Sequence, residues 1–93
     1  MIRPEQFTCA ARLLRERGHC KRSYQCDDGS IDTAWALLLA RQAVDASYEE
    51  YEAARRHLMA LLGTSLTDFN DAPETTLEVA AAALERAARE VTA

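Results

Sequence analysis

The sequence predicts a single all-α domain of four main helices, with a short extended arm or small hairpin between the first and second helices. Three observations predict this fold. Apolar residues recur three and four positions apart in four segments, the spacing of one face of an α-helix. Capping residues and glycines stand at the ends of these segments. The 93 residues are 48% hydrophobic and 28% charged, which fits one compact domain over residues 1–93.

The first helix is predicted over residues 4–17. Pro4 suits the first turn, because the N–H that proline lacks would have no partner within the helix there. An apolar stripe runs from Phe7 to Leu14 at helical spacing. Gly18 follows directly, and we expect it to end the helix in a left-handed cap.

Residues 19–30 are predicted to form the arm. They include β-tolerant residues but show no helical period, and Asp27, Asp28 and Gly29 are typical of a turn. An isolated hairpin is only marginally stable in water, so this segment is expected to pack against the helices.

The second and third helices are predicted over residues 31–44 and 48–62. Ser30 or Asp32 can cap the second helix. This helix is apolar nearly all round, so we expect it to be central and its Trp35 to lie in the core. The third helix opens with a capping box, Ser47 and Glu50 in the sequence, and Gly63 is expected to end it.

The fourth helix is predicted over residues 76–92. Thr75 and Glu78 have the spacing of a second capping box. The apolar stripe that follows is mostly alanine and includes Leu84, so a neighbouring helix can approach closely.

A polar turn precedes the fourth helix. Asn70 and Asp71 are expected to make local hydrogen bonds within this turn, and Pro73 prevents a helix from continuing through it. On this interpretation, loss of the Asn70 side chain should lower the free energy of unfolding by about 0.5–2 kcal/mol.

The order of these segments resembles a small actinobacterial and phage family, domain of unknown function 6197. Its members have W-N-D-A-P, a short turn, and then T-x-x-E-V before the last helix; Phe69 stands here where the tryptophan would be. The resemblance spans about residues 5–92 and implies a fold and a bacterial or phage origin, but no reaction. The residues expected to form its structural motif are Trp35, Phe69, Asn70, Asp71, Pro73, Thr75 and Glu78.

The three cysteines, Cys9, Cys20 and Cys26, are expected to be free thiols. Their number is odd, and residues 1–5 lack the apolar stretch of a signal peptide, so we expect a reduced, cytoplasmic protein without a membrane span. A metal site with His19 and a disulfide are the less favoured alternatives. No metal is expected, because no C-x-x-C pair is present.

Signatures of catalysis are missing from the sequence. It has no glycine-rich phosphate loop, no H-E-x-x-H motif and no nucleophile elbow around a serine. No residue is spaced to orient either histidine, His19 or His57, for proton transfer. We therefore expect a protein that is not an enzyme and binds no cofactor.

Charge is distributed unevenly along the chain. The net charge is −4, yet residues 1–25 carry six basic and two acidic residues, a net of +4, so residues 26–93 carry −8. This asymmetry predicts either a basic surface for an acidic partner or an internal match of charges.

Two function classes follow from the charge distribution. The favoured class is a helical protein-interaction or accessory module, and the alternative is a nucleic-acid-binding regulatory protein that uses phosphate contacts and stacking. The isoelectric point of about 5.1 argues against the second class. The partner-binding residues predicted for both are Arg12, Arg15, Lys21, Arg22 and Tyr24.

Overall fold

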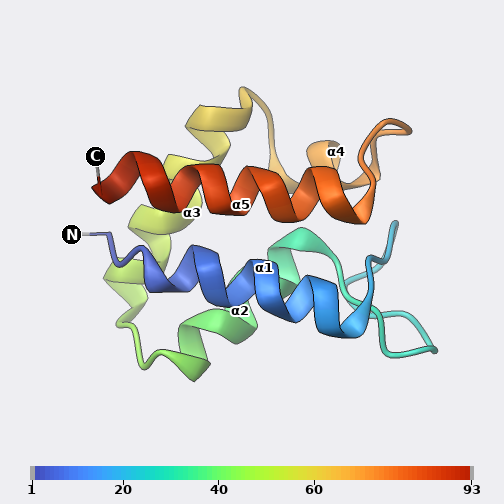
Figure 1. Cartoon of the computed structure of the whole chain (residues 1–93), viewed down its shortest axis with the longest axis horizontal. Coiled ribbons are helices and arrows are strands. Elements are labelled where there is room, and N and C mark those ends of the chain that lie inside the picture. The colour runs from blue at the N-terminus through green and yellow to red at the C-terminus, as the bar shows by residue number, and fades with distance from the viewer. Residues whose placement is uncertain (1, 93) are drawn as a thin grey trace.

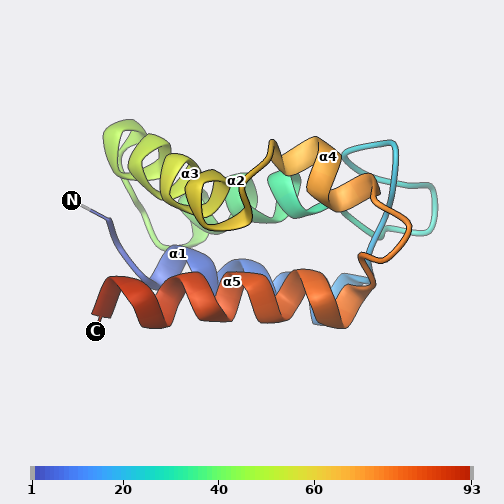
Figure 2. The ribbon, with the colours of Figure 1, turned by 90° about the horizontal axis from the view of Figure 1, so that it is seen from above.

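The computed structural model describes residues 2–92 and consists of two layers of helices (Figures 1 and 2). The first and last helices lie side by side and run in opposite directions in one layer, and the other three helices cover them. The first layer contains α1 (Glu5–Arg17) and α5 (Leu77–Thr92); the second contains α2 (Thr33–Ala43), α3 (Tyr48–Leu62) and α4 (Leu66–Asp71).

The all-α prediction is confirmed, and the four predicted helices agree with α1, α2, α3 and α5 to within two residues at each end. The short helix α4 was not predicted. It forms because Ser65 caps it, with Oγ accepting a hydrogen bond from the Asp68 N–H at 3.1 Å, and because Leu66 is buried beneath it. Phe69 also packs against the core from α4, so the segment expected to be a turn gains a helical turn of its own.

Three of the predicted helix ends are confirmed. Asp32 caps α2, because its carboxylate accepts a hydrogen bond from the Trp35 N–H at 2.6 Å. Ser47 and Glu50 form the predicted capping box at the start of α3. Gly63 ends α3 in the left-handed conformation, with φ +73°.

The capping box predicted for Thr75 and Glu78 is wrong. The helix begins at Leu77, so Thr76 is the capping residue, and its Oγ1 accepts a hydrogen bond from the Val79 N–H at 3.2 Å. Thr75 is buried instead, and Glu78 contacts α1.

Gly18 ends α1 as predicted, but not in a left-handed helical cap. Its φ of +93° and ψ of 163° lie in a region that only glycine adopts readily, and this conformation leads the chain straight into the arm. A side chain here would also meet a neighbour, because a Cβ would lie 3.3 Å from the Cβ of Ser30.

The core lies between the two layers. The alanine stripe of α5 lets it pack directly on α1, as expected from the sequence. Trp35, expected in the core, is only half-buried at its edge. The largest fully buried apolar side chains are Phe7, Leu14, Ile31, Leu37, Leu58 and Leu84.

The arm lies at the end of the molecule opposite the termini, beside the connection between α4 and α5 (Figure 1). Residues 19–30 form neither the extended arm nor the two-stranded hairpin expected from the sequence, but an irregular loop with bends at 21–24 and a turn at 27–28. Ile31 instead makes isolated bridges, one with His19 and one with Gln25. None of the helices in the described part of the chain has the length and apolar character needed to cross a membrane.

Candidate functional site: an aromatic groove beside a disulfide-closed arm

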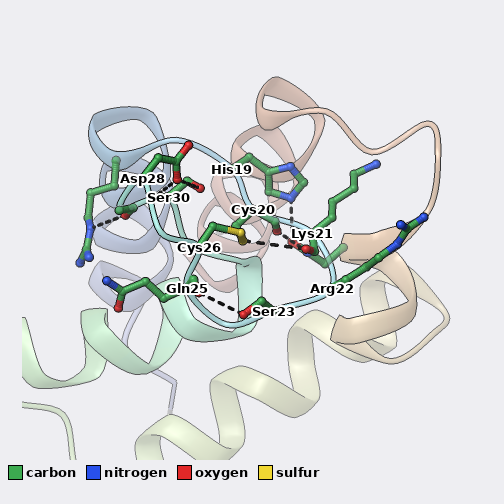
Figure 3. Close-up of a disulfide and its surroundings, with 12 residues drawn as sticks. His19, Cys20, Lys21, Arg22, Ser23, Gln25, Cys26, Asp28 and Ser30 are labelled. Atoms are coloured by element: carbon green, nitrogen blue, oxygen red, sulfur yellow. Dashed lines mark hydrogen bonds between the residues drawn. A yellow bond between two sulfur atoms is a disulfide. The ribbon is translucent and has the colours of Figure 1, made fainter.

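A disulfide between Cys20 and Cys26 closes the arm into a loop (Figure 3). The prediction of three free thiols is therefore wrong, and the buried Cys9 alone keeps its thiol. The backbone brings the pair together: the Cys20 N–H donates to the Ile31 carbonyl and the Cys26 N–H to the Ser30 carbonyl, both at 2.9 Å.

The Cα atoms of this pair are 6.0 Å apart, within the usual range for a disulfide. The bond also removes two of the sulfur ligands that a zinc site would need. No cluster of three or more potential metal ligands occurs within residues 2–92.

Thiol titration tests the disulfide directly. We expect the unfolded protein to show one reactive thiol without reductant and three with it. Because the bond closes a loop of seven residues, reduction should lower the free energy of unfolding by about 2 kcal/mol, measured by urea denaturation. The double variant Cys20→Ser/Cys26→Ser is the control, and its stability should not respond to reductant. Three reactive thiols in unreduced protein would refute the bond.

Asn70 fastens the arm to α2 from its place in α4. Its Oδ1 accepts hydrogen bonds from the Thr33 N–H at 2.9 Å and the Thr33 hydroxyl at 2.7 Å, and its Nδ2 donates to the Cys20 carbonyl at 2.9 Å. His19 Nε2 also lies 2.7 Å from Asn70 Oδ1 and is therefore the donor. The local turn bonds expected for Asn70 are largely replaced by contacts that span 37 to 51 residues of sequence.

The residues after Asn70 hold the arm from the same side. Asp71 Oδ1 accepts a hydrogen bond from the Arg22 N–H at 2.9 Å, and this bond, together with one from the Asn70 amide, lowers the pKa of Asp71. Lys21 Nζ donates to the Ala72 carbonyl at 2.6 Å, while Pro73 is exposed. The N-D-A-P segment, residues 70–73, thus holds the arm in place, and we call it the clasp.

Tyr24, within the disulfide loop, stacks on Trp35 of α2. Their ring centroids are 5.8 Å apart with an angle of 25° between the planes, and Tyr24 remains 62% exposed. The Tyr24 carbonyl also accepts a hydrogen bond from the Asp32 N–H at 3.0 Å. The arm therefore presents an aromatic side chain against the surface of α2.

The surface is hollowed on both sides of Tyr24. The apolar hollow, of about 350 Å³, lies between the arm and α2, α3 and the start of α4. The polar hollow, of about 370 Å³, shares Tyr24 and Thr67 with it, so the two form one aromatic groove. The apolar hollow is lined by Tyr24, Ala34, Trp35, Leu38, Tyr51, Arg55, Met59, Ser65, Leu66 and Thr67, and the polar hollow by Arg22, Ser23, Tyr24, Asp32, Thr67 and Asp71.

Both carboxylates of the polar hollow accept hydrogen bonds from the protein through one oxygen, Oδ1. Asp32 caps α2 and Asp71 accepts from the arm; burial raises the pKa of Asp32. The guanidinium of Arg22 has no acidic partner among residues 2–92, and its backbone has the unfavourable φ of +67°. Figure 3 shows the Arg22 side chain extending outward from the loop. Arg22 is thus the cation in this hollow with which an acidic ligand group can pair.

Arg55 lies at the opposite part of the groove and is half engaged. Its Nε and Nη2 pair with the Glu52 carboxylate at 3.1 and 2.9 Å, while Nη1 points to Met59 Sδ at 3.6 Å. Because thioether sulfur is a weak acceptor, the Nη1 edge of Arg55 remains available to a stronger one.

The predicted basic surface separates into two parts. Lys21, Arg22 and Tyr24 lie together on the arm, whereas Arg12 and Arg15 lie on α1. Arg15 pairs with Glu85 and, at 3.1 Å, with Glu78, and these bonds raise the pKa of Arg15. For Arg15, the internal charge match is therefore the observed arrangement. Arg12 lies 3.8 Å from the Glu16 carboxylate.

Most of the groove lining was missed in the sequence. One signal was present: Tyr51, Arg55 and Met59 follow one another at four-residue spacing and form a stripe on α3. That stripe mixes apolar and charged groups, as partly exposed binding surfaces do. The residues of α2 that face it could not be identified from the sequence, because they depend on how the helices pack.

Comparison with curated proteins and with solved structures returns no match. The sequence profile of one family matches residues 3–90, nearly the whole chain and including the groove, the disulfide loop and the N-D-A-P clasp. This match confirms the resemblance seen in the sequence, and the chain belongs to the family of unknown function DUF6197.

Proposed function

We propose that this chain is a non-enzymatic protein-interaction module, a bacterial or phage accessory factor that takes a segment of an acidic partner protein in the aromatic groove. The observation that carries this proposal is the half-open groove around the Tyr24–Trp35 stack. Tyrosine, tryptophan and arginine dominate the binding energy of protein interfaces, and they gather here on a hollowed surface.

The position of one cation, Arg22, favours an acidic group in the partner. Asp32 and Asp71 each accept a backbone N–H through Oδ1, whereas the Arg22 guanidinium has no ion pair within residues 2–92. A guanidinium binds a carboxylate through two parallel hydrogen bonds. The occupant therefore places an apolar side chain in the apolar hollow and an aspartate or glutamate at Arg22.

The lining of the groove supports a binding role over a catalytic one. It contains no histidine and no cysteine, the residues that most often transfer protons or act as nucleophiles at neutral pH. The cytoplasmic location expected from the sequence stays a prediction; there, thiol reductants would act on the Cys20–Cys26 bond.

Selection from a library of random twelve-residue peptides tests the proposal. We expect the selected peptides to combine an apolar residue with a nearby aspartate or glutamate. Tyr24→Ala and Arg22→Glu should each weaken their binding at least about tenfold. Arg12→Glu is the matched control, because it reverses an exposed arginine outside the groove, and it should leave binding unchanged. Selected peptides that bind the Tyr24 and Arg22 variants normally would refute the groove as the site.

A binding measurement with nucleic acid separates the two function classes. Twelve-nucleotide random single-stranded DNA should not bind at physiological salt, because the chain carries a net charge of −4. Binding that Arg22→Glu abolishes and that falls steeply with salt would instead support the nucleic-acid-binding class.

A further inference from the structure

We infer that the segment taken by the aromatic groove is proline-rich and bound in the polyproline II conformation; this inference rests on the proposed function and adds the composition and conformation of the occupant. Three features of the groove point to it: aromatic side chains from three elements, hydrogen-bond donors without acceptors, and a fold that offers few other ways to hold a peptide.

Three aromatic side chains, each from a different element, line the apolar hollow. Tyr24 of the arm stacks on Trp35 of α2, and both line the apolar hollow with Tyr51 of α3. Grooves between such rings accept the flat, rigid face of proline, and proline-rich segments bind with little loss of conformational entropy because they are already ordered.

Several polar atoms around the apolar hollow are donors that have no acceptor within the described residues and that a ligand can reach. Within residues 2–92, neither the indole N–H of Trp35 nor the hydroxyl of Tyr51 has a hydrogen-bond acceptor, although both residues are half-buried. The Nη1 edge of Arg55 has only the weak acceptor Met59 Sδ. A polyproline II chain makes no internal hydrogen bonds, so its backbone carbonyls are free to accept from these groups. Proline itself brings no N–H that would need an acceptor.

The fold disfavours the other common modes of peptide binding. Strand addition needs an open strand edge, and the described residues form only isolated bridges. A bound helix needs an apolar groove that spans at least two helical turns. The apolar hollow, of about 350 Å³, ends at Tyr24, where the polar hollow begins. In polyproline II, residues three apart share one face. Prolines on that face can fill the apolar hollow while an acidic residue one turn away reaches Arg22.

Fluorescence titration tests the inference, since Trp35 is the only tryptophan of the chain. The probe is an eleven-residue peptide of three Pro-Pro-Leu repeats followed by two glutamates, and the matched control peptide has every proline replaced by alanine. We expect the proline peptide to change the Trp35 emission saturably and to bind at least about tenfold more tightly than the alanine peptide, because it is preorganised.

Two variants of the protein sharpen the test. Tyr51→Phe keeps the ring but removes the hydroxyl donor, so it should lower the affinity for the proline peptide by about two- to tenfold. Tyr48→Phe makes the same change outside the groove lining and should have no effect. Equal loss in both variants would contradict the assigned hydrogen bond.

The outcomes distinguish this inference from the proposed function. Equal or tighter binding of the alanine peptide would overturn the inference and leave the groove as a binding site. The same holds if both probes fail while library-selected peptides bind in a Tyr24-dependent way. If no peptide binds the groove at all, both proposals are wrong.

Discussion

Asn70→Ala is expected to lower the free energy of unfolding by about 3–5 kcal/mol, more than the sequence alone suggested. Asn70 is 1% exposed, and its amide is the shared partner of four groups in the arm and α2. Removing it leaves the Thr33 N–H and hydroxyl and the Cys20 carbonyl buried without these partners. Each such group is removed from water on folding without gaining a hydrogen bond in return, and this lowers the free energy of unfolding.

Urea denaturation followed by circular dichroism measures this effect. Asp71→Ala is the matched control, because it removes the neighbouring side chain from the same clasp while losing hydrogen bonds nearer the surface. Its loss of stability should be clearly smaller. If Asn70→Ala is no more destabilising than Asp71→Ala, the buried hydrogen bonds of Asn70 do not hold the arm.

Leu84→Ala is the second substitution with a large expected effect, about 2–5 kcal/mol. Leu84 is fully buried on α5, between helices whose alanine side chains already allow close contact. The backbones have little room left to approach, so a cavity should remain where the leucine was. Val79→Ala is the control on the same helix, since Val79 is 44% exposed, and it should change stability by less than about 0.5 kcal/mol. A melting temperature unchanged by Leu84→Ala would place that side chain outside the core.

The helices could be predicted because their signals are local. Periodicity and caps such as Ser47 with Glu50 depend on residues within one turn of each other. Adjacent threonines blurred one such signal: Thr75 has the right spacing for a cap, but the helix begins one residue later and uses Thr76. The short helix α4 was missed because a polar segment with a following proline is also typical of a turn.

The contacts that build the site could not be predicted, because they join distant parts of the chain. Asn70 binds residues 37 to 51 positions away, and the disulfide forms because Ser30 and Ile31 hold both cysteines. Tyr24 stood out in the sequence as an aromatic residue among polar ones with no evident role in the core. Its stacking partner on α2 did not, since an apolar helix gives no sign of which face stays partly open.

The backbone of Arg22 has a consequence for attempts to stabilise this protein. A glycine or asparagine would occupy φ +67° more comfortably, so a sequence optimised for stability alone would not place arginine there. Strained residues of this kind cluster at functional sites. The positive φ of Arg22 costs the arm some conformational free energy, and it holds a cation at the edge of the groove. Replacing Arg22 by glycine or asparagine would then raise the melting temperature and weaken the binding of the partner at the same time.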